Sequence, residues 1–175
     1  MEIGIIINCE NIGEVKGNGI IGGIVGTLAG SAWTEVYNIE VSNCINRGKI
    51  ENLNTRTGGI VGEIGTIYKE MNIEFKNLYN ITKLETGIVG YINYNIYNSP
   101  TYKFYFENVY DCNDVHLTKN NVVTYEGEIF KKTEDEMRTQ DFIDNTMNKY
   151  IKENNLESQG WRLWNLGEEG YPIIT

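Results

Sequence analysis

The sequence predicts a mainly β repeat protein, a short parallel β-helix solenoid with a small helical cap at its C-terminal end. Three observations predict this fold: a recurring asparagine element, a glycine element that follows it, and a change of pattern after about residue 128. The chain has 175 residues, of which 41% are hydrophobic, so it can bury a sizeable core. We expect a β-repeat region over residues 1–128 and a helical, Trp-rich capping module over 129–175.

The asparagine element has the template apolar, any residue, Asn, apolar, any residue, Asn or Asp. Its copies are centred on Asn8, Asn43, Asn77 and Asn108, at intervals of 35, 34 and 31 residues. Such intervals are typical of solenoids and related arrays. Asparagine tolerates left-handed corners, and stacked asparagine side chains can bond to one another along an axis. We therefore expect the four asparagines to form a structural ladder.

The glycine element follows the first three copies and ends each time in Gly-Ile-Val-Gly. We expect its glycines either to turn the chain sharply with positive φ or to let one repeat approach the next closely. These turn glycines are Gly22, Gly23, Gly26, Gly58, Gly59, Gly62, Gly87 and Gly90.

The number of chain turns in each repeat can be read in two ways. If one repeat makes one turn, the Cα atoms of Cys9 and Cys44 should lie about 5 Å apart, and if it makes two, about 9.6 Å. The 15 residues between Asn43 and Gly58 favour two turns. The third repeat argues against this, because only 9 residues separate Asn77 from Thr86.

The glycine elements, each paired with an upstream Asn-x-x-Asn, resemble the GLUG-motif repeats of large bacterial surface proteins, including the N-terminal region of IgA-specific metallopeptidases. The resemblance covers roughly residues 6–115. The third copy departs from it at Thr86, and the fourth lacks the glycine element. The resemblance implies a spacer or adhesive stalk at the cell surface or outside the cell, and it carries over no catalytic residue.

Composition and charge narrow the classes of partner. The net charge is −9 and no Lys/Arg cluster exists, which argues against nucleic acid and anionic membranes. No apolar run is long enough to insert in a membrane. Residues 1–4 lack the features of a secretory signal, so we expect either a cytosolic protein or, as we favour, an excerpt of a longer secreted chain. The expected partner is a host or bacterial surface glycan or protein.

The C-terminal module has the signals of a helix followed by a closing strand and turn. Thr133 and Glu136 form a predicted capping box. An apolar face follows at helical spacing, so we expect residues 134–153 to be mostly helical and to cover one end of the repeats. That face consists of Ile143, Met147, Tyr150 and Ile151.

The sequence offers no convincing catalytic or metal site, and no cofactor is expected. Cys9, Cys44 and Cys112 occupy related places in the repeats and are expected to be stacked core thiols. The single histidine, His116, has no partner at ligand spacing and is expected to be a surface or turn residue. The Gly-x-Gly-x-x-Gly match at residues 17–22 precedes an apolar segment and not a helix, which argues against dinucleotide binding.

Acidic residues leave an alternative open, because glycosidases use paired carboxylates. Glu107, Asp111 and Asp114 lie close together in the sequence, although common carboxylates usually form a solvated face. The function that we expect is thus a non-enzymatic structural or adhesive repeat module, and the alternative is a carbohydrate-active enzyme, a glycosidase or lyase, on a β-helix.

An aromatic stretch is the one candidate binding region. Aromatic faces beside amide side chains can hold a sugar or a protein partner. The competing interpretation is that alternate aromatics pack on the repeats. The candidate binding residues are Tyr91, Tyr94, Tyr97, Tyr102 and Tyr105.

Overall fold

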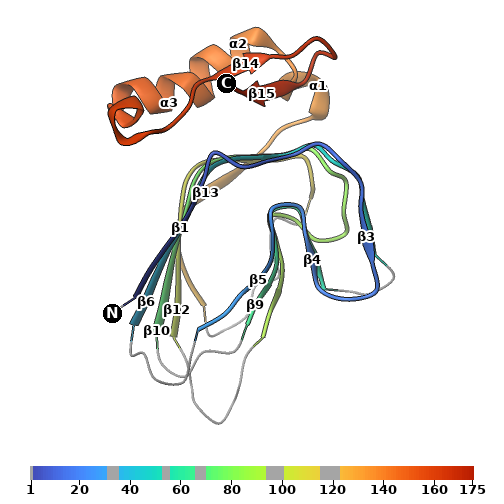
Figure 1. Cartoon of the computed structure of the whole chain (residues 1–175), viewed down its shortest axis with the longest axis vertical. Coiled ribbons are helices and arrows are strands. Elements are labelled where there is room, and N and C mark those ends of the chain that lie inside the picture. The colour runs from blue at the N-terminus through green and yellow to red at the C-terminus, as the bar shows by residue number, and fades with distance from the viewer. Residues whose placement is uncertain (1, 31–35, 53–55, 66–69, 94–100, 115–122) are drawn as a thin grey trace.

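The computed structural model describes residues 2–30, 36–52, 56–65, 70–93, 101–114 and 123–175. The chain is mainly β, as predicted, and its sheets are parallel apart from one C-terminal hairpin. The largest sheet has the order β1-β6-β10-β12-β13, and Figure 1 shows its strands one behind another. These strands are β1 (Glu2–Ile7), β6 (Val36–Asn46), β10 (Glu70–Asn80), β12 (Thr101–Asp111) and β13 (Val123–Lys131).

Shorter strands complete the repeats in separate sheets. One three-stranded sheet, β11-β9-β5, is formed by the glycine elements, and β2 extends the first strand's pairing with β6. Two further pairs, β3-β7 and β4-β8, occur only in the first two repeats among the described residues. The bounds are β2 (Glu10–Asn11), β3 (Val15–Gly17), β4 (Ile21–Gly22), β5 (Val25–Leu28), β7 (Ile50–Asn52), β8 (Thr57–Gly58), β9 (Val61–Ile64) and β11 (Val89–Ile92).

Each copy of the asparagine element pairs directly with the next copy. Ile6 lies opposite Val41, and the amide of Ile45 donates to the carbonyl oxygen of Cys9 at 2.9 Å. The glycine elements pair with one another in their own sheet and are not interposed. The expectation of two turns in each repeat is therefore wrong. The glycine elements form a separate sheet, which a gap length cannot distinguish from an alternate strand of the same sheet.

Two ladders of side-chain amides run across the strands. In the first, each asparagine donates from Nδ2 to Oδ1 of the preceding one, at 2.6 to 2.7 Å. All four members, Asn8, Asn43, Asn77 and Asn108, have φ between 48° and 56°. Left-handed backbone at these corners suits asparagine, whose short side chain can bond locally.

The second ladder comes from the Asn or Asp three residues later in the template. Here Nδ2 donates to the following repeat, at 2.8 to 2.9 Å, so donation runs in the opposite direction. Its members are Asn11, Asn46, Asn80 and Asp111. Asp111 receives the last bond, and a carboxylate is suited to that place because it is a pure acceptor.

The glycines of the repeats provide close approach and not positive φ. Positive φ occurs at Gly127, Gly160 and Gly170 among the described glycines, and at none of the predicted turn glycines that the structure describes. A Cβ on Gly23 would overlap the side chain of Asn46, and one on Gly59 would overlap that of Asn80. Each Gly-Gly pair thus leaves room for the second asparagine of the next repeat.

The C-terminal module begins with the predicted capping box. The hydroxyl of Thr133 accepts from the amide of Glu136, whose carboxylate accepts from the amide of Thr133. The helical prediction for residues 134–153 is confirmed, with a π-helical turn in the middle. The elements are α1 (Glu134–Met137), α2 (Gln140–Phe142), η1 (Ile143–Met147), α3 (Asn148–Glu153), η2 (Leu156–Gln159), β14 (Trp164–Leu166) and β15 (Pro172–Ile174).

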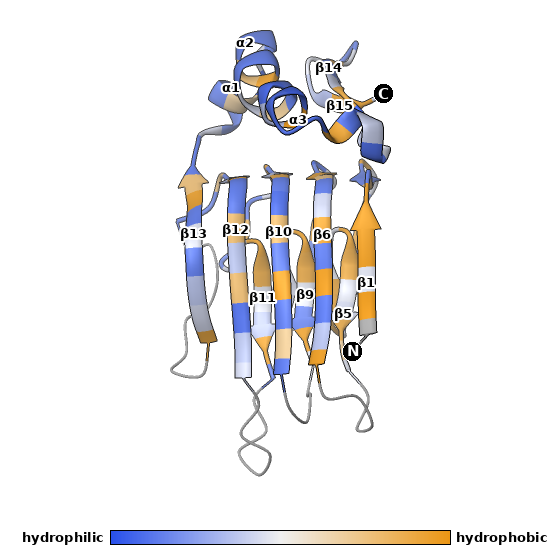
Figure 2. Ribbon diagram, turned by 90° about the vertical axis from the view of Figure 1, so that its left-hand side faces the viewer, coloured by the Kyte–Doolittle hydropathy of each residue, from blue (hydrophilic) through white to orange (hydrophobic). Residues whose placement is uncertain are grey.

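This module lies along the repeats, not over one end of them. Figure 2 shows it across the carboxyl ends of the strands from β1 to β13. Main-chain oxygens of the module accept hydrogen bonds from Asn8, Asn43 and Asn108, so it contacts the first, second and fourth copies. Beneath it, Tyr79 packs edge-on to Trp164 and Tyr110 packs edge-on to Phe142. The expectation of an end cap is therefore wrong, because the apolar face of the helices matches a row of side chains that crosses successive strands.

Candidate functional site

Outward side chains of the largest sheet form rows whose composition changes from repeat to repeat. The register places Ile5, Glu40, Glu74, Tyr105 and Glu126 in one such row. The next row contains Ile7, Ser42, Lys76 and Glu107. In the inward row between them, Val41, Phe75 and Phe106 are buried, so the described charged groups of these strands gather on the outward face.

A hollow of about 350 Å³ lies on this face between β10, β12 and β13. It forms where pairing shifts register after Phe106, opposite Gly127, which has φ 83°. A Cβ on Gly127 would overlap the carbonyl oxygen of Phe106, so the position requires glycine for space and for φ. Its lining residues are Glu74, Lys76, Tyr105, Phe106, Glu107, Glu126 and Gly127.

Lys76 is the cation of this hollow. It pairs with Glu74, and its Nζ lies 3.6 Å from the carboxylate of Glu40. Partial burial works to lower the pKa of Lys76, but the hydrogen bond to Glu74 and the neighbouring carboxylates outweigh it and raise that pKa. Lys76 therefore stays charged and balances part of the acidic row.

Tyr150 of α3 borders the same face from the C-terminal module. Burial, followed by a hydrogen bond with Glu107, raises the pKa of its hydroxyl. The hydroxyl is therefore a neutral donor at physiological pH, directed at one of the carboxylates of the hollow. With the carboxylates and Tyr105, the arrangement offers acceptors, a donor and an aromatic face, which is suited to binding a polar, hydroxyl-rich molecule.

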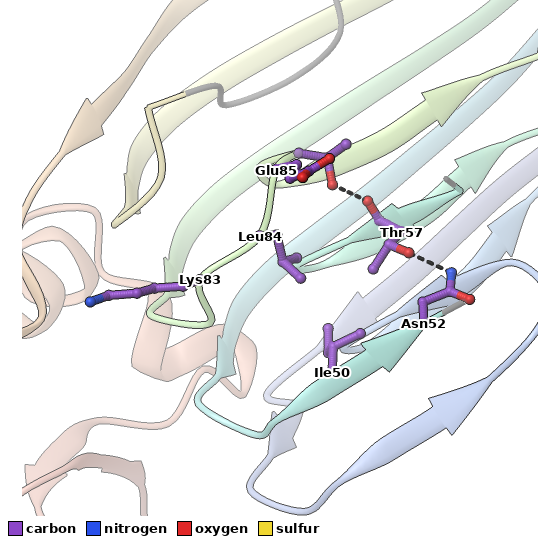
Figure 3. Close-up of a pocket in the computed structure, with 7 residues that line it drawn as sticks. Ile50, Asn52, Thr57, Lys83, Leu84 and Glu85 are labelled. Atoms are coloured by element: carbon purple, nitrogen blue, oxygen red, sulfur yellow. Dashed lines mark hydrogen bonds between the residues drawn. The ribbon is translucent and has the colours of Figure 1, made fainter. Parts of the chain in front are cut away.

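A second hollow, of about 420 Å³, lies where the third repeat is shorter than its predecessors. Figure 3 shows Ile50 and Leu84 on its apolar side, with Lys83 and Glu85 at its rim. The third repeat has no described strand that corresponds to β7, so β7 has a partner on one side only. Thr86, where the earlier repeats have glycine, donates instead to the carbonyl oxygen of Thr57.

The predicted tyrosines do not form one site. Tyr102 is fully buried, and its hydroxyl donates to the carbonyl oxygen of Asn93 at 2.9 Å, so its assignment to a binding surface is wrong. Tyr105, three residues on, points to the outer face because strand side chains alternate. Tyr91 is 37% exposed on β11 in a different sheet, beneath the guanidinium of Arg56. Tyr94 and Tyr97 lie outside the described residues.

Sequence reasoning missed Glu74, Lys76 and Glu126, which the register brings beside Tyr105 and Glu107. On β10, the alternation of apolar and polar residues could have predicted that Glu74 and Lys76 point outward. Their grouping also requires the pairing register, which a single sequence does not state. Asp114, which the sequence grouped with Glu107, pairs instead with Lys131 away from this hollow.

The cysteines divide into two environments. Cys9 and Cys44 occupy one row, as predicted. In the fourth copy that row is filled by Val109, and Cys112 lies three residues later in the template. All three thiols are free. Burial raises the pKa of Cys44, and burial with the charge of Asp111 raises the pKa of Cys112 to about 11.

Two searches of the described residues bear on other functions. In them, no three His, Cys, Asp or Glu side chains are grouped so that they could hold a metal ion. Across the same residues, no helix combines the length and apolar character that a membrane span requires. His116 lies outside the described residues.

Comparison with known proteins adds no relative: no protein family, curated protein or solved structure matches the chain.

Proposed function

We propose that the repeats stack as single coils of a short β-solenoid and that the chain is a non-enzymatic structural or adhesive module of a cell-surface or secreted protein. One observation carries the proposal. The template asparagines form ladders across all four repeats and the template glycines allow close approach in the first three, whereas the outward rows differ from one repeat to the next. A constant interior beneath a variable surface is how solenoids provide extended binding faces.

The resemblance to GLUG-motif repeats supports the same proposal and its cell-surface location. The ligand that we propose is a surface glycan or protein, held in the hollow between β10, β12 and β13. Tyr105 would supply an apolar face for a sugar ring or a partner side chain, and Glu107 an acceptor for its hydroxyl or amide groups.

The proposal is tested by exposing the chain to panels of surface glycans and surface proteins, measuring binding and product formation together. Binding without turnover is expected, and Tyr105→Ala should weaken it roughly tenfold, the loss of about 1.4 kcal/mol. Tyr91→Ala is the matched control, because that tyrosine is exposed on another sheet. Equal loss in both variants, or no binding to any panel member, would contradict the proposed site.

A carbohydrate-active enzyme is the second candidate, favoured by three carboxylates in one hollow, Glu74, Glu107 and Glu126. Glycosidases need two carboxyl groups about 5 to 10 Å apart on either side of the scissile bond. Incubation with polysaccharides and reducing-end detection would identify it. Turnover that is abolished by Glu107→Gln or Glu74→Gln, with folding unchanged, would replace the first proposal by this one.

A further inference from the structure

In the described part of the chain, the strands of the first repeat are paired on one side only. Its strands β1 and β5 are terminal in the two larger parallel sheets, and β3 and β4 each pair on one side with the second repeat. Within the described part of the chain, no strand lies against the opposite side of any of them. The backbone donors and acceptors of β1 on that side form a template for another strand.

The hydrophobic core continues to this edge without closing. Positions that are fully buried in the second repeat are only partly buried in the first, although they carry similar residues. The pairs are Ile6 with Val41, Cys9 with Cys44, Ile24 with Ile60, and Val25 with Val61.

Large apolar side chains are also exposed on the first repeat. Ile3 and Ile5 of β1 are 69% and 64% exposed, and Ile12 is 64% exposed. They account for half of the exposed large hydrophobic residues in the described chain, so the apolar surface is concentrated here. An apolar surface on an unpaired strand is typical of an interaction site.

The charged side chains of residues 3–28 do not oppose association. Residues 3–28 contain three charged side chains, and each forms an ion pair with the second repeat. The pairs are Glu10 with Arg47 at 3.0 Å, Glu14 with Lys49 at 2.8 Å, and Lys16 with Glu51 at 2.8 Å. Although the chain carries a net charge of −9, residues 3–28 can therefore meet the same residues of an identical chain without uncompensated repulsion between them.

The opposite edge of the largest sheet has the features that prevent strand addition. In β13, Gly127 interrupts the register, and Glu126, Glu128 and Lys131 are exposed. Bulges and charged side chains protect sheet edges from pairing. A head-to-tail array of copies would need this edge, whereas a two-fold pair would need only β1.

We infer that β1 is the interface with a second copy of this chain, paired antiparallel about a two-fold axis near Gly4. In this arrangement Ile3 lies opposite Ile5 of the partner subunit, and Ile5 opposite the partner's Ile3. The four isoleucines form one apolar cluster on the outer face. The sheet becomes continuous across the two copies, and the half-buried first-repeat core is covered.

Sedimentation over a wide range of protein concentration tests the interface, with a dimer expected for the unmodified chain. Ile3→Lys with Ile5→Lys should give a monomer, because four lysines would meet at the interface. The matched control is Thr124→Lys with Glu126→Lys, which occupies the same two rows on β13 and should remain dimeric. Circular dichroism and the urea midpoint check that both variants fold.

A monomer at every concentration would overturn the inference, and so would assemblies that grow beyond two copies. Loss of dimer in the β13 control, or its persistence in the β1 variant, would also overturn it. Amide hydrogen exchange of the unmodified chain tests the interface without substitutions. The amides of residues 3–7 should exchange about tenfold more slowly at dimer-forming than at dimer-dissociating concentration. Exchange that is independent of concentration would refute the contact through β1.

Discussion

The indole N–H of Trp164 donates a hydrogen bond to Oδ1 of Asn43, joining the C-terminal hairpin to a ladder residue 121 positions earlier. Both side chains are fully buried. Asn43 also accepts from Asn77 and donates to Asn8 and to the carbonyl oxygen of Arg162. All four hydrogen-bonding positions of this amide are therefore occupied, and the repeats and the module share one polar centre.

Asn43→Ala should be among the most destabilising substitutions in the chain. It leaves buried partners unpaired, at about 1–3 kcal/mol each, and puts alanine at φ 48°. We expect a loss of at least about 3 kcal/mol in urea unfolding. Asn43→Gly separates the two causes. Glycine adopts this φ freely, so this variant should recover only the stability that alanine loses through backbone strain. Full recovery with glycine would show that the hydrogen bonds contribute little.

Gly59→Ala should destabilise the repeats through overlap with the side chain of Asn80. Overpacking of this kind costs about 1–3 kcal/mol. Gly19→Ala is the matched control, because a Cβ there meets no atom within 4 Å, and its effect should stay within about 0.5 kcal/mol. Thermal or urea unfolding measures both. Equal effects would contradict the close approach between Gly59 and Asn80.

Thr133→Ala should remove the capping box at the start of α1. The expected cost is about 1 kcal/mol, since the hydroxyl that accepts from the amide of Glu136 is lost, whereas the backbone N–H of residue 133 can still donate to the Glu136 carboxylate. Thr133→Ser should retain most of the stability, because serine presents the same hydroxyl. Helical circular dichroism during urea titration follows the module, and an unchanged midpoint in the alanine variant would refute the capping contribution.

Stability should fall as the pH rises above about 9, because buried acids that are neutral in the fold ionise more readily when the chain unfolds. The pKa of Cys112 rises from its ordinary value of 9.0 to about 11. Its contribution to the free energy of unfolding is therefore complete below pH 9 and is lost as the pH approaches 11. Burial raises the pKa of Cys44 and Tyr79 in the same direction. Urea midpoints at pH 7, 9 and 11 should decrease, and Cys112→Ala should reduce the fall between the last two.

The sequence predicted the local features that depend on one residue type at one place. Left-handed asparagines, the capping box and the helical span follow from short-range preferences, which a single chain states directly. The second ladder was within reach as well, because its Asn or Asp belonged to the same template.

Features that depend on how distant segments match could not be predicted in this way. The interval between Asn43 and Gly58 allows one turn or two, and only pairing between the copies decides. To assign Tyr102 and Tyr105 to a face of the sheet, one must know which positions of the strand point inward. The surrounding aromatic run hides this alternation, because both faces carry apolar residues. The place of the module depends on the row of Ile45, Tyr79 and Tyr110, which forms only when the strands are aligned.

The opposed directions of donation in the two amide ladders also have an electrostatic consequence. Amides aligned head to tail add their dipoles, as peptide groups do in a helix. In the first ladder the positive end lies at Asn8, and in the second it lies at Asp111, where a carboxylate meets it. The two ladder dipoles therefore oppose each other and largely cancel, so further repeats of this template would lengthen both ladders without building a field along the stack.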